Sequence, residues 1–194
     1  MPRPKQRTPE LRDRLLLAAI DTLADDGVAG FTTRRIAQGA DTSVPAVYEL
    51  FGDKSGLVRE IFFEGFRRLG SRLLEIPVTP DPRGDLMAAV GVLRDFVQTH
   101  PGMAEVMFAR PFSDFDPGPA ELTAGATVRE DLTERLRRCI AAGKLAGDPT
   151  DLGHVLIALV QGLARQEIAG WLGSTPESVE RRWSTAFERL LRQP

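Results

Sequence analysis

Apolar residues recur at spacings of three and four along the whole 194-residue sequence, and this pattern most limits what the chain can form. It is the spacing of amphipathic helices, and no stretch alternates apolar and polar residues as a half-buried strand does. Four candidate helix starts carry threonine or aspartate followed by proline, at residues 8–9, 81–82, 148–149 and 175–176. Such a pair caps a helix, because the side-chain oxygen accepts a hydrogen bond from a free amide and proline needs no partner there. The sequence therefore predicts an all-α fold of about nine helices.

The pattern sets the expected helix bounds and two domains. The predicted helices span residues 9–26, 33–40, 43–50, 53–74, 83–99, 102–109, 120–142, 150–172 and 176–192. Gly27 is expected to end the first helix, because glycine readily adopts the left-handed conformation of a helix end. We expect an N-terminal helix-turn-helix domain of three helices, residues 1–53, and a C-terminal helical domain, residues 54–194.

Composition excludes several classes of protein. The single cysteine, Cys139, cannot form an internal disulfide, and with two histidines it supplies too few ligands for a His/Cys zinc site. No apolar run approaches the roughly 18 residues that a membrane helix needs, and the polar, basic N-terminus lacks the apolar core of a signal peptide. We expect a cytoplasmic protein with no membrane partner, no metal and no cofactor.

Residues 33–50 have the pattern of a helix-turn-helix. Two short helices that cross steeply need a small residue where they meet, here Ala37, and apolar residues on their facing sides. The facing residues are Ile36, Ala40, Val47 and Leu50. Asp41 lies at the turn, where a left-handed residue is usual, and aspartate is one of the few residues that tolerate it. Ser43 or Thr42 can cap the second helix, whose first turn contains Pro45.

The exposed side of this unit carries side chains suited to DNA. Hydroxyls and free amides at a helix N-terminus bind phosphate, and the first turn of a recognition helix contacts bases. The candidate DNA-binding residues are Thr32, Thr33, Arg34, Ser43, Val44, Pro45, Tyr48 and Lys54. Val44 and Pro45 have no donor and could read only thymine methyl groups or groove shape. Taken singly, Arg34 is also explained as a solvated charge and Tyr48 as a rim residue of the small core.

The segment FTTRRIAQGADTSVPAVYELFGDKSGL, residues 31–57, resembles the DNA-binding domain of the TetR/AcrR family of bacterial transcriptional regulators. The likeness covers about residues 12–62, and its most specific part is a tyrosine, a phenylalanine and a lysine three residues apart. The resemblance implies an all-helical homodimer in which three helices bind a double-stranded DNA operator and the remainder binds an effector and the partner subunit. It also implies phosphate contacts from Thr33, Tyr48 and Lys54.

Two acidic residues depart from the family pattern. Asp41 stands where glycine is common, and Glu49 adds a second acid near the DNA-facing side. Both would repel phosphate unless they turn away or face a cytosine amine. They leave the operator sequence open.

The C-terminal region contains no recognisable catalytic motif, neither a glycine-rich phosphate loop nor a nucleophile elbow. We therefore expect no catalytic residue and no enzyme. His154 lies three residues from Asp151 on one helix face, but no nucleophile accompanies it. Methionine and phenylalanine side chains form either core or an adaptable pocket for an apolar ligand of unknown identity. The predicted effector pocket comprises Phe96, Met103, Met107, Phe108, Phe112, His154, Gln161 and Arg165.

The last two predicted helices suggest a dimer interface. The helix over 150–172 is apolar on more than one face and must be covered on two sides. In TetR-like proteins the last two long helices form a four-helix dimer interface, which would account for this excess. The predicted interface residues are Leu156, Leu159, Val160, Leu163, Val179, Trp183, Phe187 and Leu190. Residues 104–173 also resemble the C-terminal domain of actinobacterial TetR-like regulators, although their Trp-His-Gly triplet is reduced here to Gly162.

The sequence thus predicts a ligand-responsive, DNA-binding transcriptional regulator, a repressor released from its operator by a small apolar effector. The effector must prefer one dimer geometry, since tight binding alone would shift no equilibrium. One alternative is a helical ligand carrier or enzyme that retains a vestigial DNA-binding domain. Another is an architectural DNA-binding protein without an effector.

Overall fold

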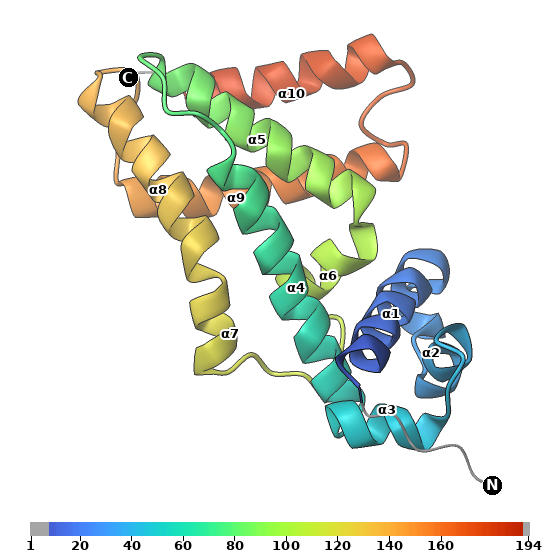
Figure 1. Cartoon of the computed structure of the whole chain (residues 1–194). Coiled ribbons are helices and arrows are strands. Elements are labelled where there is room, and N and C mark those ends of the chain that lie inside the picture. Colours follow the sequence, from blue (N-terminus) through green and yellow to red (C-terminus); the bar gives the residue numbers. More distant parts are fainter. Residues whose placement is uncertain (1–7, 192–194) are drawn as a thin grey trace, which may run out of the picture. The chain divides into compact units, whose positions relative to one another are not determined.

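The computed structural model describes residues 8–191, which form only helices and the loops between them (Figure 1). The helices are α1 (Pro9–Gly30), α2 (Thr33–Gly39), α3 (Val44–Phe51), α4 (Lys54–Leu74), α5 (Pro82–Thr99), α6 (Pro101–Ala109), α7 (Pro119–Ala124), α8 (Ala126–Ala141), α9 (Pro149–Ile168) and α10 (Pro176–Leu190). The predicted all-α fold is confirmed. Within the described ranges, no helix combines the length and the hydropathy needed to cross a membrane.

The expected helix starts appear where threonine or aspartate precedes proline. Thr8, Asp148 and Thr175 each accept a hydrogen bond from a backbone N–H of the first helical turn. α5 also begins at the expected proline, Pro82, but here the first-turn carboxylate of Asp85 binds the preceding loop. These local signals therefore determined where four of the helices begin.

Two helix ends depend on glycine or lie near one. Gly27 has φ +65° and ψ −168°, so the regular part of α1 ends where the sequence predicted, and one further turn follows. α9 ends at Ile168, before the predicted end at residue 172, and Gly170 follows with φ +74°. The helix predicted over residues 120–142 is divided into α7 and α8 at Gly125, a residue of low helix propensity.

The chain forms two compact units. The first contains residues 8–67 and 100–124, and the second contains residues 68–99 and 125–191. α6 packs against α1, and Glu121 of α7 forms an ion pair with Arg59 of α4, so α6 and α7 belong to the unit of the N-terminal helices. The division differs from the predicted domain boundary after residue 53, which was drawn from the chain order alone.

Aromatic and glycine contacts hold α6 and its following loop in the first unit. The rings of Phe31 and Phe112 lie 5.2 Å apart between centroids, with an angle of 54° between their planes. Gly102 allows α6 to approach α1 closely, because a β-carbon at this position would lie 2.8 Å from the carbonyl oxygen of Leu23. α1 and its C-cap residue thus contact residues that follow them by about 80 positions in the sequence.

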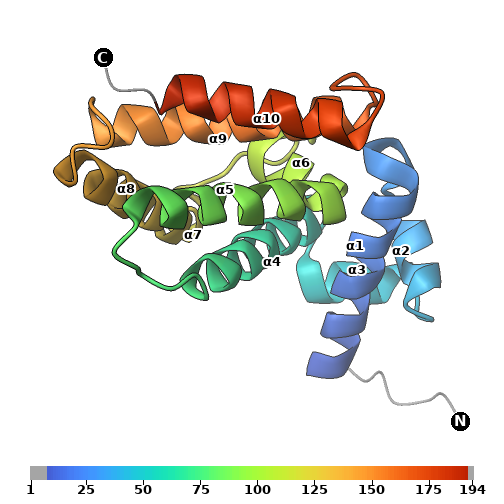
Figure 2. The same cartoon turned by 90° about the horizontal axis from the view of Figure 1, so that it is seen from above.

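The second unit contains α5, α8, α9, α10 and the end of α4, and Figure 2 shows α10 alongside α9. A polar cluster links three of these helices. The guanidinium of Arg94 in α5 donates to both carboxylate oxygens of Glu167 in α9, at 3.0 and 2.9 Å, and to Glu180 in α10 at 2.8 Å. The indole N–H of Trp183 also donates to Glu167, at 2.8 Å.

A buried carboxylate connects the α4–α5 loop to α8. Asp85 accepts hydrogen bonds from the hydroxyl of Thr79 at 2.6 Å, from its backbone N–H at 2.9 Å, and from Arg138 at 2.7 Å. These bonds stabilise the ionised form, those from Thr79 most strongly, and they lower the pKa of Asp85 to about 2. The carboxylate is therefore charged in the folded protein at neutral pH.

Candidate nucleic-acid interface

A sharp turn joins α2 to α3. Asp41 has the left-handed backbone expected at this place, with φ +49°, and the N–H of Thr42 donates to the carbonyl of Ala37 at 2.9 Å. The facing sides of the two helices are apolar and buried at Ile36, Ala37, Ala40 and Val47, while Leu50 is half-buried. The predicted helix-turn-helix therefore forms, with its own small core.

The start of α2 presents hydroxyls and one available arginine. Thr32 is the N-cap residue and accepts a hydrogen bond from the N–H of Arg35 at 3.3 Å, and Thr33 follows, half-buried. The guanidinium of Arg35 binds the carboxylate of Asp26. Arg34 is exposed and forms no ion pair with any residue from 8 to 191. Within residues 8–191, Arg35 is thus the arginine of the two that is paired with an acid, and Arg34 is the exposed one without such a pair.

The first turn of α3 is accessible. Ser43 occupies the N-cap position, as one of two expected candidates, but its hydroxyl makes no capping hydrogen bond. Pro45 is exposed and Val44 is half-buried. Tyr48 follows Val44 by one helical turn, and 48% of its surface is accessible. α3 therefore offers a hydroxyl, two small apolar surfaces and a phenol to whatever lies against it.

Lys54, the first residue of α4, contacts two aromatic rings. Its Nζ lies 4.8 Å from the centroid of the Phe112 ring and 5.8 Å from that of Phe31, and the side chain is half-buried. Both distances are within the range of a cation–π interaction. These rings restrict the position of the ammonium group but leave its N–H groups able to donate to an anion.

The charged residues around this surface include acids. Asp41 and Glu49 are both exposed, so neither is removed from the surface by burial. Arg12 supplies a fixed cation nearby: it forms an ion pair with Glu60 at 2.7 Å and lies 4.8 Å from the ring centroid of Phe51. Sequence reasoning missed this role of Arg12, although its position at the start of the family likeness was visible.

Two family models match the chain. Residues 15–61 match the model described as "Bacterial regulatory proteins, tetR family". Residues 86–192, more than half of the chain, match the model described as "Tetracyclin repressor-like, C-terminal domain". The chain belongs to the TetR family. It is accordingly a DNA-binding transcriptional regulator with an N-terminal helix-turn-helix, as predicted.

Solved structures share the fold of this TetR-family chain. A protein of unknown function from Rhodococcus sp. RHA1 is 26% identical, with a TM-score of 0.79, over 98% of this chain and 100% of that one. A tetR-family regulatory protein from Rhodococcus RHA1 is 20% identical, with a TM-score of 0.76, over 96% and 100%. The TetR family regulator PfmR from Thermus thermophilus is 19% identical, with a TM-score of 0.71, over 93% and 98%. No curated protein matches the sequence.

The residues predicted for an effector pocket lie in both units. Met103, Met107, Phe108 and Phe112 belong to the first unit, while Phe96, His154, Gln161 and Arg165 belong to the second. Met103, Met107, Phe112 and Phe96 are buried, which is also what the core alternative predicts. Gln161 is half-buried, and Arg165 and His154 are exposed on α9.

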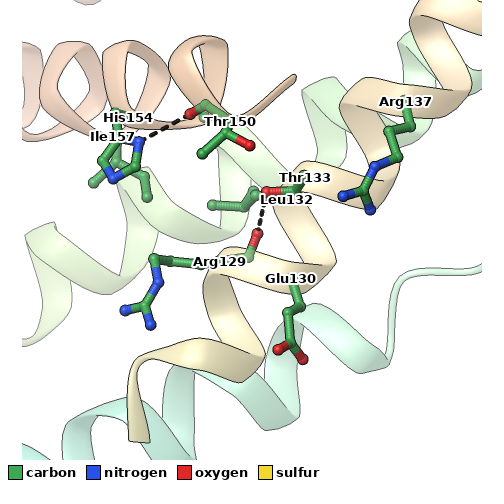
Figure 3. Close-up of a pocket in the computed structure, with 9 residues that line it drawn as sticks. Arg129, Glu130, Leu132, Thr133, Arg137, Thr150, His154 and Ile157 are labelled. Carbon is green, nitrogen blue, oxygen red and sulfur yellow. Dashed lines mark hydrogen bonds between the residues drawn. The ribbon is translucent and has the colours of Figure 1, made fainter. Parts of the chain in front are cut away.

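A pocket of about 230 Å³ lies between α8 and α9, lined by side chains of both helices (Figure 3). Of the eight residues predicted for an effector site, it includes His154 alone. The other lining residues belong to α9 and to a stretch of α8 that sequence reasoning left unassigned. The sequence feature that could have indicated this stretch is the pair Arg129 and Arg137, which lie two helical turns apart and present charge on one face of the helix.

The residues predicted for a dimer interface divide into two groups. Leu156, Val160, Trp183 and Phe187 are buried within the chain itself. They pack the core of the second unit, so the prediction is corrected at these four positions. Leu159, Leu163, Val179 and Leu190 are half-buried and retain accessible surface. The apolar stripes indicated correctly that these helix faces are covered, but other helices of the same chain cover part of them.

The outer face of α9 is uncharged over most of its length. Val155, Ala158 and Gly162 are exposed at helical spacing, and no residue from 152 to 164 is Asp, Glu, Lys or Arg. A β-carbon added at Gly162 would meet no atom within 4 Å. The outer face of α10 differs, since its exposed residues include Glu177, Arg181 and other polar side chains.

Proposed function

We propose that this TetR-family protein is a cytoplasmic, dimeric repressor that a small ligand releases from its operator, and that it is not an enzyme. The observation that carries the proposal is the accessible first turn of α3, with Tyr48 one turn beyond it. α3 would lie in the major groove, where Ser43, Val44 and Pro45 face the bases. Phosphate contacts would come from Tyr48 and the remaining DNA-binding candidates, Thr32, Thr33, Arg34 and Lys54.

Loss of the Tyr48 hydroxyl tests this arrangement. A hydrogen bond to a charged phosphate contributes about 1.5–3 kcal/mol, so Tyr48→Phe should weaken binding by about ten-fold or more per subunit. Because a phosphate contact carries no sequence information, operator and unrelated DNA should be affected alike. Fluorescence anisotropy with the DNA upstream of the gene, and with shuffled DNA, gives both affinities.

A change in base preference after Tyr48→Phe would contradict the assignment of Tyr48 to a phosphate. Gln38→Ala, an exposed change on α2, is a suitable control for folding and concentration. An absence of sequence-selective binding in the unsubstituted protein would instead support a ligand carrier or enzyme with a vestigial DNA-binding domain.

We infer that the outer face of α9 pairs two copies of the chain. Small residues such as Ala158 and Gly162 let helices approach closely, and Leu159 and Val155 add apolar area. An uncharged helix face of this kind is unusual in a monomer and favours a protein interface. The dimer would present two copies of α3 to half-sites about 34–36 Å apart, one helical turn of DNA.

A matched pair of glycine substitutions tests the interface. Gly162→Glu places a carboxylate on the proposed contact face, whereas Gly91→Glu places one on the exposed side of α5. Neither added β-carbon would meet an atom within 4 Å, so both variants should fold. In sedimentation equilibrium, Gly162→Glu should behave as a 21.3 kDa monomer and Gly91→Glu as a dimer. Dimeric Gly162→Glu would refute this interface.

Release from DNA requires that the ligand bind one dimer geometry more tightly than the other. The predicted effector residues Met103, Met107, Phe108 and Phe112 support an apolar part of the ligand, since methionine and phenylalanine adapt to varied apolar shapes. Addition of a true effector to the preformed DNA complex should lower DNA affinity. If every ligand that binds the protein leaves DNA affinity unchanged, the repressor is not ligand-responsive.

A further inference from the structure

The pocket between α8 and α9 has the chemistry of an anion site with an apolar wall (Figure 3). We propose that it binds a small organic anion, a carboxylate carried on a short aliphatic chain. Binding of this anion needs no DNA. Only the further step, that this anion is an effector bound apart from Met103, Met107, Phe108 and Phe112, rests on the proposed function.

Positive charge predominates among the lining side chains. Arg129 and Arg137 come from α8, and Glu130 is the acidic residue of the lining. Arg137 forms an ion pair with Glu134 at 3.3 Å, but both side chains are more than half exposed. Exposed pairs of this kind contribute little free energy, so a bound carboxylate can replace Glu134 as the partner of Arg137. The planar guanidinium group also matches the two oxygens of a carboxylate.

The opposite side of the pocket offers polar atoms from α9. Nδ1 of His154 lies 2.9 Å from the backbone carbonyl of Thr150. Because a carbonyl only accepts, Nδ1 carries the hydrogen, and Nε2 of the neutral ring is then an acceptor, so the donor that α9 offers to a carboxylate is a hydroxyl. The hydroxyl of Thr150 makes no hydrogen bond with any residue from 8 to 191. In Figure 3 the ring of His154, on α9, and the guanidinium of Arg129, on α8, both lie on the left of the view.

The remaining wall is apolar and small. Leu132 and Gly153 are buried, and Ile157 is half-buried. The volume of about 230 Å³ lies below the range of roughly 300–1,000 Å³ typical of pockets for drug-sized ligands. A carboxylate with a short aliphatic chain satisfies both the charge and the size.

Isothermal titration of the full chain with hexanoate, in the absence of DNA, tests the proposal. Hexan-1-ol serves as the uncharged ligand of the same chain length. Hexanoate should bind with one site per chain, and hexan-1-ol at least ten-fold more weakly. Arg129→Gln with Arg137→Gln should weaken hexanoate binding by about ten-fold or more, as loss of charged hydrogen bonds does, and should leave hexan-1-ol unaffected. Arg181→Gln, on exposed α10, is the matched control and should bind hexanoate normally.

Equal hexanoate affinity in the unsubstituted protein and the double arginine variant would overturn the proposal, as would no saturable binding of hexanoate. Both arginines are exposed, and unchanged thermal unfolding would show that the double variant is folded. A gel shift with hexanoate then separates the two proposals. Hexanoate binding with unaltered DNA affinity would retain the anion site and refute its effector role, while a protein that binds no DNA would refute the proposed function alone.

Discussion

Replacing Lys54 by methionine tests whether this residue contacts a DNA phosphate. Its Nζ lies 4.8 Å from the Phe112 ring centroid, and a cation–π contact of a half-buried lysine contributes about 1 kcal/mol. Methionine keeps most of the apolar contact, and its sulfur interacts favourably with aromatic rings. We therefore expect Lys54→Met to lower the free energy of unfolding by less than about 1 kcal/mol, and the melting temperature by no more than about 4 °C.

The effect of Lys54→Met on DNA binding should depend on salt. Each lost phosphate contact changes the slope of log K against log salt concentration by about 0.9, hence by about 1.8 for a dimer. Between 50 and 200 mM salt, the ratio of unsubstituted to variant affinity should therefore fall by about 12-fold. This ratio can be measured by fluorescence anisotropy across a salt series with the same DNA.

The control for Lys54→Met is Lys144→Met, the same chemical change at an exposed turn after α8. Lys144→Met should leave the salt dependence unchanged. A Lys54→Met variant whose affinity relative to the unsubstituted protein is the same at all salt concentrations would refute the phosphate contact. The contact of Lys54 with Phe112 would then have a structural role only.

Three further changes test the fold around these sites. Asp41→Ala should lower the free energy of unfolding by about 1 kcal/mol in urea, because a β-carbon is unfavourable at φ +49°, whereas Asp41→Gly should not; equal losses would contradict this. Asp85 has its pKa lowered to about 2, so its contribution to stability is present above pH 4 and is lost as the pH falls toward 2. At pH 7, Asp85→Asn should have a lower free energy of unfolding than the unsubstituted protein. Between pH 4 and pH 2 its free energy of unfolding should fall less than that of the unsubstituted protein. Parallel pH profiles of the variant and the unsubstituted protein would argue against this role of Asp85. Gly102→Ala should destabilise by about 1–3 kcal/mol because its methyl group would lie 2.8 Å from the Leu23 carbonyl oxygen, while Gly91→Ala should not destabilise; similar melting temperatures would exclude the clash.

Features encoded by neighbouring residues could be predicted from the sequence. Threonine or aspartate before proline marked the starts of four helices, and the side chains at three of them form the expected caps. Gly27 and Asp41 adopt the left-handed backbone expected of them, because that conformation depends on the residue type itself. The accessible turn of α3 also follows from the local helix-turn-helix pattern.

Contacts between distant residues were not predicted. The pairing of Phe31 with Phe112 joins residues 81 positions apart, and a single sequence contains no signal for such a pair. An amphipathic stripe likewise shows that a face is covered, but not by what. Trp183 and Phe187 are therefore core residues of their own chain although the stripe suggested a partner subunit.

The polar contacts of α8 were missed for the same reason. Arg138 binds Asp85, which lies 53 residues earlier, and Arg137 reaches a pocket shared with α9. In the sequence these arginines look like a solvated helix face. The packing of α8 against α5 and α9 determines that Arg138 binds a buried carboxylate and that Arg137 lines a pocket.

In vitro selection of random duplex DNA by the full-length protein, followed by measurement of stoichiometry on the selected site, tests the central claim most directly. The proposed function predicts a two-fold symmetric site whose half-sites are centred about one helical turn apart, or a multiple of it, with equal numbers of chains and half-sites. Tyr48→Phe should bind this site more weakly without altering the selected sequence. Failure to enrich any sequence, or binding of a single chain to an asymmetric site, would contradict a dimeric repressor that reads DNA through α3.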